Sequence, residues 1–229
     1  MSEQQTVFVL DDDQAARESL RWLLESVGHR VSCPASALEF LDSYDGSVPG
    51  CLVLDVRMPG MSGLELQSHM LERGWCLPVI IVTGHGDVPM AVRAMKAGAV
   101  DFLQKPYNDQ TLLDRIQQAL DLCSQRRQSH DELAMIRTNY EHLTQREREV
   151  AAMVVAGKAN KVVAIELGLS PKTIEVHRAN VMSKMQAHSL SELVQMYMRL
   201  DVETVDSSLV FPEKARADRT AGTYVRDNP

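Results

Sequence analysis

No apolar stretch in this chain is long enough to span a bilayer, which takes about 20 consecutive residues. The first residues, MSEQQTVF, also lack the basic start and the long apolar core of a secretory signal. We therefore expect a cytoplasmic protein without a membrane partner. A length of 229 residues suits two small domains or one large domain.

Cysteine is scarce and scattered, with only Cys33, Cys51, Cys76 and Cys123 in the whole chain. There is no CxxC pair and no cluster of cysteine with histidine, so the pattern argues against a structural zinc site. Four separate thiols are simplest to explain as reduced cysteines of a cytoplasmic protein.

The chain also lacks an even distribution of charge. The net charge is -7, but residues 1–124 contain 9 Lys and Arg against 17 Asp and Glu, whereas residues 143–200 contain 8 against 5. An acidic first half followed by a small basic module predicts two functions, one of which could be nucleic-acid binding. The alternative is that the uneven distribution of charge is ordinary scatter. The charge alone does not distinguish scatter from a nucleic-acid-binding module.

Apolar runs of strand length alternate with helical patterns through the first 124 residues. The runs are Val7–Leu10, Val31–Cys33, Cys51–Leu54, Val79–Val82 and Phe102–Leu103. Because these runs do not alternate with polar residues, they predict strands buried on both faces. The first half is therefore expected to be an α/β domain, with a five-stranded, doubly wound parallel sheet between two layers of helices.

Polar residues follow four of the runs: Asp11 with Asp12, then Asp55, Thr83 and Lys105. The carboxyl ends of parallel strands meet at one edge of a sheet, where ligands bind. Three carboxylates at one edge repel each other unless a cation is present, which predicts a Mg²⁺ site completed by waters and a phosphate. Asp13 is expected to cap the helix that follows.

The other two residues at this edge suit phosphate chemistry. Lys105 would supply a mobile positive charge for a phosphate, and Thr83 a hydroxyl donor. One of the carboxylates could then act as a nucleophile and form an aspartyl phosphate. A single Asp after a strand usually serves only as the cap of the next helix. Capping does not explain why polar residues follow four of the apolar runs.

At these residues the sequence resembles the receiver domain of bacterial two-component response regulators. The matching segments are LDDD, LVLDVRMPGMSG around Asp55, IIVTGHGD around Thr83, and DFLQKP with Phe102 and Lys105. The resemblance covers residues 5–122 and implies a flavodoxin-like strand order. It also implies that a sensor histidine kinase phosphorylates Asp55.

The resemblance further implies functions for the surrounding residues. Asp12, Asp55 and the carbonyl of Arg57 would hold the metal, with Asp11 assisting through water. Lys105 would pair with the phosphoryl group, and the Lys105–Pro106 bond would be cis. The phosphoryl group would attract the Thr83 hydroxyl, and Phe102 would turn inward behind it as a switch. Plain core packing is the alternative for Phe102.

Residues 109–142 contain no Gly or Pro, and residues 124–132 are polar throughout. One long helix and two helices broken near Ser129 both fit this pattern, and a coiled-coil seam is only weakly supported. We expect a receiver at 1–122, a helical linker at 123–141, a DNA-binding module at 142–200 and a disordered tail at 201–229. A partner-binding or appended segment is the alternative for the tail.

Residues 142–200 are dense in helix signals. Thr144 with Glu147 forms a capping box, Gly157 and Gly168 end helices, and Ser170 precedes a proline at the first helical position. Four helices with short glycine turns predict a helix-turn-helix arrangement, whose second helix can enter the major groove. A helical module that does not bind DNA is the alternative.

The helix after Ser170 should pack inward through Ile174, His177, Val181 and Met185. Residues expected at base edges lie on the other face: Lys172, Glu175, Val176, Ala179 and Ser183. Thr173 is a further candidate for DNA contact. Lys158, Lys161, Arg178, Asn180 and Lys184 are the candidates for phosphate contacts, which position a domain without reading sequence.

LTQREREV and NKVVAIELGLSPKTIEVHRANVMSKM resemble the LuxR/FixJ-type output domain, and residues 5–200 as a whole resemble a FixJ-type transcriptional regulator. One departure is Tyr107, which stands where this family usually has Phe. The resemblance implies a non-enzymatic regulator that binds promoter DNA as a phosphorylation-dependent homodimer and could contact RNA polymerase.

Two alternatives belong to other classes. A haloacid-dehalogenase-like phosphotransferase would need a DxD around the nucleophile and a cap insertion, but Val56 and Arg57 follow Asp55. A phosphorylation-dependent scaffold would bind protein through its helical module, and salt-insensitive partner binding without DNA binding would favour it.

Overall fold

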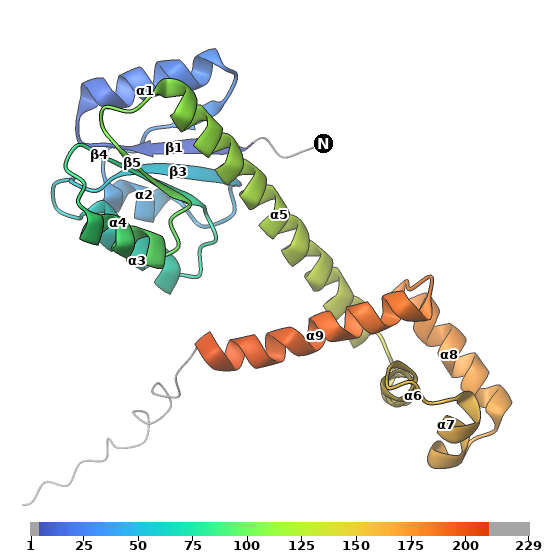
Figure 1. Ribbon diagram of the computed structural model, residues 1–229. Coiled ribbons are helices and arrows are strands. Elements are labelled where there is room, and N and C mark those ends of the chain that lie inside the picture. Colours follow the sequence, from blue (N-terminus) through green and yellow to red (C-terminus); the bar gives the residue numbers. More distant parts are fainter. Residues whose placement is uncertain (1–4, 211–229) are drawn as a thin grey trace, which may run out of the picture. The chain divides into compact units, whose positions relative to one another are not determined.

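The computed structural model describes the backbone of residues 5–210 and the side chains of residues 5–200. The chain divides into two compact units, Met1–Ser129 and His130–Pro229, each described here by itself (Figure 1). The last helix extends to Val210, and the remainder of the expected disordered tail, residues 211–229, lies outside the described residues.

A five-stranded parallel sheet forms the centre of the first unit. Its strands are β1 (Thr6–Leu10), β2 (Arg30–Ser32), β3 (Gly50–Asp55), β4 (Val79–Thr83) and β5 (Asp101–Gln104). The strand order is β2-β1-β3-β4-β5, and every neighbouring pair is parallel. The predicted doubly wound sheet of flavodoxin-like order is therefore confirmed.

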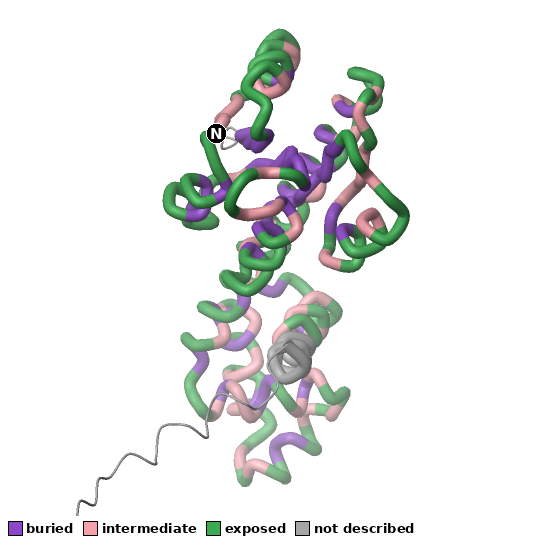
Figure 2. Tube along the Cα trace, turned by 90° about the vertical axis from the view of Figure 1, so that its left-hand side faces the viewer, coloured by how far each residue is buried: buried purple, intermediate pink, exposed green. Residues whose placement is uncertain are grey.

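Two helix layers bury the sheet. The helices of this unit are α1 (Gln14–Ser26), α2 (Ala37–Ser43), α3 (Gly63–Glu72), α4 (Val88–Lys96) and the start of α5 (Asp109–Glu141). Val7 and Val9 of β1 pack with α1 and α5, whereas Phe8 and Leu10 pack with α2, α3 and α4. Both faces of β1 are thus buried, which explains its continuous apolar sequence. Purple segments in Figure 2 mark this buried sheet.

One uninterrupted helix, α5, covers residues 109–141, so the alternative of a break near Ser129 is wrong. Cys123 of α5 is buried in the first unit, where its sulfur accepts the Gly50 N–H at 3.3 Å. Ile136, farther along the helix, is buried in the core of the second unit. The last turns of α5 therefore contribute a fifth helix to the helical module.

The second unit continues with α6 (Gln145–Val155), α7 (Asn160–Leu167), α8 (Pro171–Met185) and α9 (Leu190–Val210). The capping box of Thr144 and Glu147 is present, and Gly168 ends α7 in the left-handed conformation that glycine adopts without strain. Within residues 5–210, no helix combines the length and the apolar character that a membrane span requires.

Candidate functional site

Three carboxylates meet at the carboxyl edge of the sheet. Asp55 ends β3 and Asp11 follows β1, and the two strands are paired through Leu10 and Leu54. Carboxylate oxygens of Asp11, Asp12 and Asp55 lie within 4.8 Å of one another. Asp11 and Asp55 are buried while Asp12 is exposed, so the cluster opens to solvent on one side.

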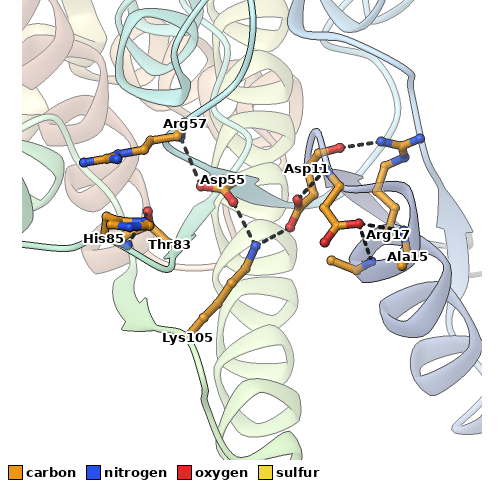
Figure 3. Close-up of polar contacts among 10 residues, drawn as sticks. Asp11, Ala15, Arg17, Asp55, Arg57, Thr83, His85 and Lys105 are labelled. Atoms are coloured by element: carbon orange, nitrogen blue, oxygen red, sulfur yellow. Dashed lines mark hydrogen bonds and ion pairs between the residues drawn. The ribbon is translucent and has the colours of Figure 1, made fainter.

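Lys105 reaches this cluster from the loop after β5 (Figure 3). Its Nζ atom lies 2.5 Å from Asp11 Oδ2 and 2.8 Å from Asp55 Oδ2. Partial burial alone would lower the pKa of Lys105, but its hydrogen bonds to the two carboxylates outweigh burial and raise the pKa. The lysine therefore stays charged, and its ammonium pairs with two of the three carboxylates. The Lys105–Pro106 bond is cis, as expected.

Backbone contacts fix the directions of the two buried carboxylates. Asp11 Oδ1 accepts the Asp13 N–H at 3.0 Å, and Asp55 Oδ1 accepts the Arg57 N–H at 3.0 Å. Arg17 of α1 donates to the Asp11 carbonyl at 2.6 Å. Asp13 caps α1 by accepting from Ala15, as predicted. Each remaining Oδ2 atom points to the shared position where Lys105 lies.

The donor set suits a hard divalent cation. All three groups offer carboxylate oxygens, the ligands that Mg²⁺ prefers, and Mg²⁺ usually retains several waters. An open cleft beside the cluster, lined by Asp12, Val56, Arg57, Met58, Pro59 and Ser62, leaves room for those waters and for a phosphoryl group. The acidic pocket is thus consistent with divalent-metal binding.

Thr83 and Phe102 lie on β4 and β5, the two strands that follow β3 in the order of the sheet. Thr83 ends β4, is 1% exposed, and its Oγ1 accepts the His85 N–H at 3.4 Å. Phe102 on β5 is half-buried and packs against the core under α3 and α4. The structure thus places the hydroxyl at the carboxyl end of β4 and the aromatic ring on the adjacent strand β5.

The second unit presents one face of α8 to solvent. Ile174, Val181 and Met185 are buried, and His177 is half-buried, so the predicted inward face is confirmed. The predicted base-edge residues Lys172, Glu175, Val176, Ala179 and Ser183 are exposed, as is Asn180, and Thr173 is half-exposed. The structure thus gathers these candidates on one accessible face.

The residues predicted to contact DNA phosphates differ in their partners within the protein. Lys161 is exposed, Lys158 pairs with Glu166 at 2.6 Å, and Arg178 donates to Asn160 Oδ1 at 2.9 Å. Lys184 instead lies 2.6 Å from Glu147, whose exposed fraction is 4%. This ion pair gives Lys184 a structural function that its sequence position did not indicate.

Neighbouring donors compensate the negative charge of the buried Glu147 carboxylate. Its Oε2 also accepts the Thr144 N–H at 2.8 Å and the Thr144 hydroxyl at 3.0 Å. Burial alone would raise the pKa of Glu147, but the bonds from Lys184 and Thr144 together lower it to about 2. The capping box was visible in the sequence, whereas the pair with Lys184, 37 residues away, was not.

Comparisons with known proteins agree with both units. The family described as the response regulator receiver domain matches residues 7–117, and the luxR family of bacterial regulatory proteins matches residues 141–197. The transcriptional regulatory protein FixJ of Azorhizobium caulinodans is 47% identical over 91% of this chain and 99% of its own length. The response regulator protein TodT of Pseudomonas putida is 46% identical over 85% of this chain and 86% of its own length.

Solved structures extend the similarity to the full architecture. The response regulator StyR is 45% identical, with a TM-score of 0.78 over 86% of this chain and 99% of that chain. Full-length FixJ from B. japonicum is 46% identical, with a TM-score of 0.54 over 88% of this chain and 99% of that chain. The chain therefore belongs to the FixJ-type response regulators of two-component systems, which join a receiver domain to a luxR-type DNA-binding domain.

Proposed function

We propose that Asp55 accepts a phosphoryl group from a sensor histidine kinase and that this modification controls promoter binding in the cytoplasm. One observation carries the proposal: the buried Asp55 carboxylate shares the Lys105 ammonium with Asp11, beside the open cleft at Asp12. An oxygen of Asp55 would form the new bond to phosphorus as the phosphorus–nitrogen bond of the donor histidine breaks.

The other residues of the cluster hold and balance the transferred group. Asp11, Asp12, Asp55 and the Arg57 carbonyl would hold Mg²⁺, which would neutralise phosphoryl charge during transfer. Lys105 would move from the Asp55 carboxylate to the oxygens of the phosphoryl group. The Thr83 hydroxyl would donate to another of these oxygens, and Phe102 would turn inward behind it. The chain thereby acts as a phosphoacceptor rather than as an enzyme with its own substrate.

Phosphorylation would favour a homodimer. Val88, Val92 and Met95 form an apolar stripe along α4, with exposed fractions of 77%, 46% and 47%. The stripe begins immediately after the loop that follows Thr83, so a second copy could cover it when that loop moves. Equal sedimentation with and without a phosphoryl mimic would count against dimerisation.

The dimer would place two α8 helices on paired half-sites of double-stranded DNA. The exposed face of α8 would contact base edges, and Lys158, Lys161, Arg178 and Asn180 would contact phosphates. Lys184 would act mainly through Glu147. Dimerisation multiplies a modest affinity per domain without new base contacts, and DNA-bound copies could then contact RNA polymerase.

The experiment is to incubate the full chain with Mg²⁺ and a small acyl phosphate. Borohydride reduction would then convert an aspartyl phosphate to homoserine for peptide mass spectrometry. We expect one modified residue, Asp55, and no modification in Asp55→Asn. Modification elsewhere, or steady release of phosphate without a modified Asp55, would favour a phosphotransferase instead.

A further inference from the structure

Gly86, in the loop between β4 and α4, lacks space for a side chain. An ideal β-carbon on Gly86 would lie 2.7 Å from Cε1 and 2.8 Å from Cζ of Phe102, and 3.4 Å from Cγ2 of Thr83. Real β-carbons do not approach other atoms closer than about 3.0 Å. The Phe102 ring therefore occupies the place where a side chain of residue 86 would begin.

The nature of the obstacle distinguishes Gly86 from other crowded glycines. A β-carbon on Gly50 or Gly63 would meet backbone carbonyl oxygens of the sheet at 1.8 Å and 2.2 Å, so substitution there would displace the backbone of a strand. At Gly86 the obstacle is the far end of a rotatable side chain. An alanine at position 86 would thus displace the ring rather than unfold the domain.

The same loop contains a matched control. Gly84, two residues earlier, has no atom within 4 Å of an ideal β-carbon. Neither Gly84 nor Gly86 has a φ angle in the left-handed region, so alanine costs no backbone strain at either position. The β-carbon of an alanine would therefore meet Phe102 and Thr83 at position 86, but no atom within 4 Å at position 84.

The loop that contains Gly86 controls one end of α4. Asp87 caps that end by accepting the Met90 N–H at 2.7 Å. The other end is held by Gln67 of α3, which is 2% exposed and donates to the carbonyls of Ala94 and Ala97 at 3.2 and 2.9 Å. A shift of the loop would consequently tilt α4 about a fixed end.

We propose that Gly86 is a positioning residue that couples the Phe102 ring to the β4–α4 loop. Without a phosphoryl group, the ring lies where a side chain of residue 86 would be, and the loop cannot close over Thr83. When Thr83 moves toward the phosphoryl group, the ring leaves this place and the loop follows. This inference rests on the proposed switch function of Thr83 and Phe102.

The first test measures whether the Phe102 ring is displaced. The full chain would be labelled with 4-fluorophenylalanine, and Phe102→Leu would assign one of the four resonances. Without any phosphoryl mimic, Gly86→Ala should shift the Phe102 resonance, while Gly84→Ala should leave it unchanged. An unshifted Phe102 resonance in Gly86→Ala would overturn the proposal, whether or not Asp55 is the phosphoacceptor.

The second test measures the coupling. With Mg²⁺ and beryllofluoride as the phosphoryl mimic, Gly86→Ala should bind the mimic about fivefold more tightly than the wild type and Gly84→Ala. In the Phe102→Leu background the same substitution should change the affinity by less than about twofold. Weaker binding, or an equal effect in both backgrounds, would overturn the proposal. Failure of the wild type to bind the mimic would instead contradict the proposed function of Asp55.

Discussion

Each unit contains a buried carboxylate paired with a lysine, but the two pairs differ in charge balance. In the first unit, Lys105 pairs with Asp11 and Asp55 in a cluster that also contains the Asp12 carboxylate, beside an open cleft. In the second unit, Lys184 faces Glu147 alone, and Thr144 supplies two further hydrogen bonds. Short lysine–carboxylate distances occur in both units, so distance alone does not distinguish a binding site from a structural ion pair. An excess of like charge indicates a binding site, and complete compensation indicates a structural contact.

Removal of the lysine from the unbalanced cluster should have the largest effect. Lys105→Met should slow phosphoryl uptake from a small acyl phosphate by about 100-fold, because the ammonium that pairs with Asp55 would no longer offset the charge of the incoming group. Lys96→Met, an exposed lysine of α4, serves as the control. The rate of Asp55 modification measures the effect, and equal rates in both variants would remove Lys105 from the mechanism.

Removal of a carboxylate from the same cluster should separate binding from stability. Asp12→Asn should weaken Mg²⁺ binding by about 10- to 100-fold. Without Mg²⁺, the same change should raise the thermal midpoint by roughly 2–4 °C, because one repelling charge is lost. Titration calorimetry and thermal unfolding measure the two effects. A lower midpoint would show that the three carboxylates do not repel each other.

Removal of the charge of Glu147, which pairs with Lys184, should lower stability rather than raise it. Glu147→Gln should lower the free energy of unfolding by about 2 kcal/mol, because Lys184 and Thr144 lose a charged acceptor. Glu149→Gln, at a half-buried position of the same helix, removes only a contact with neighbouring Arg146 and should change it by less than about 0.5 kcal/mol. Urea unfolding of the full chain measures both, and equal effects would contradict the structural function of Glu147.

The pKa of Glu147 adds a pH window to this comparison. Because folding lowers this pKa to about 2, the contribution of Glu147 is complete above the ordinary glutamate pKa of 4.5 and is lost as the pH falls toward 2. The difference in stability between wild type and Glu147→Gln should therefore shrink across this range. A difference independent of pH would exclude the carboxylate as its source.

The smallest effect is expected for the substitution of an exposed lysine that is predicted to contact a DNA phosphate. Lys161→Ala should weaken binding to all DNA sequences about equally and reduce the slope of log affinity against log salt by about 1. Lys184→Ala should instead mainly reduce stability, because its ammonium pairs with Glu147. DNA-binding isotherms at several salt concentrations distinguish the two variants, and matching salt slopes would contradict the assignment.

The sequence predicted those features that depend on local pattern. Val7–Leu10 and Cys51–Leu54 were identifiable because both faces of the central strands are buried, and the polar residues after them marked the sheet edge. The inward face of α8 followed from helical spacing alone. In each case the residues that carry the signal lie within a few positions of one another.

Contacts between distant segments could not be predicted in this way. The Lys184–Glu147 pair joins residues 37 positions apart, and Gln67 reaches carbonyls about 30 positions away. Periodicity also left α5 undecided near Ser129, because a polar segment can be either an exposed helix or a loop. The contact of Gly86 with Phe102 depends on how β4 and β5 pair, and only the folded backbone shows it.

The central claim is that phosphorylation of Asp55 controls DNA binding. Its most direct test is to capture genomic DNA fragments with the purified full chain, with and without Mg²⁺ and a small acyl phosphate, beside Asp55→Asn. We expect recurrent fragments that share a two-fold-related motif and are enriched only when Asp55 can be phosphorylated. Equal enrichment by the wild type and Asp55→Asn, or the absence of specific fragments under either condition, would contradict it.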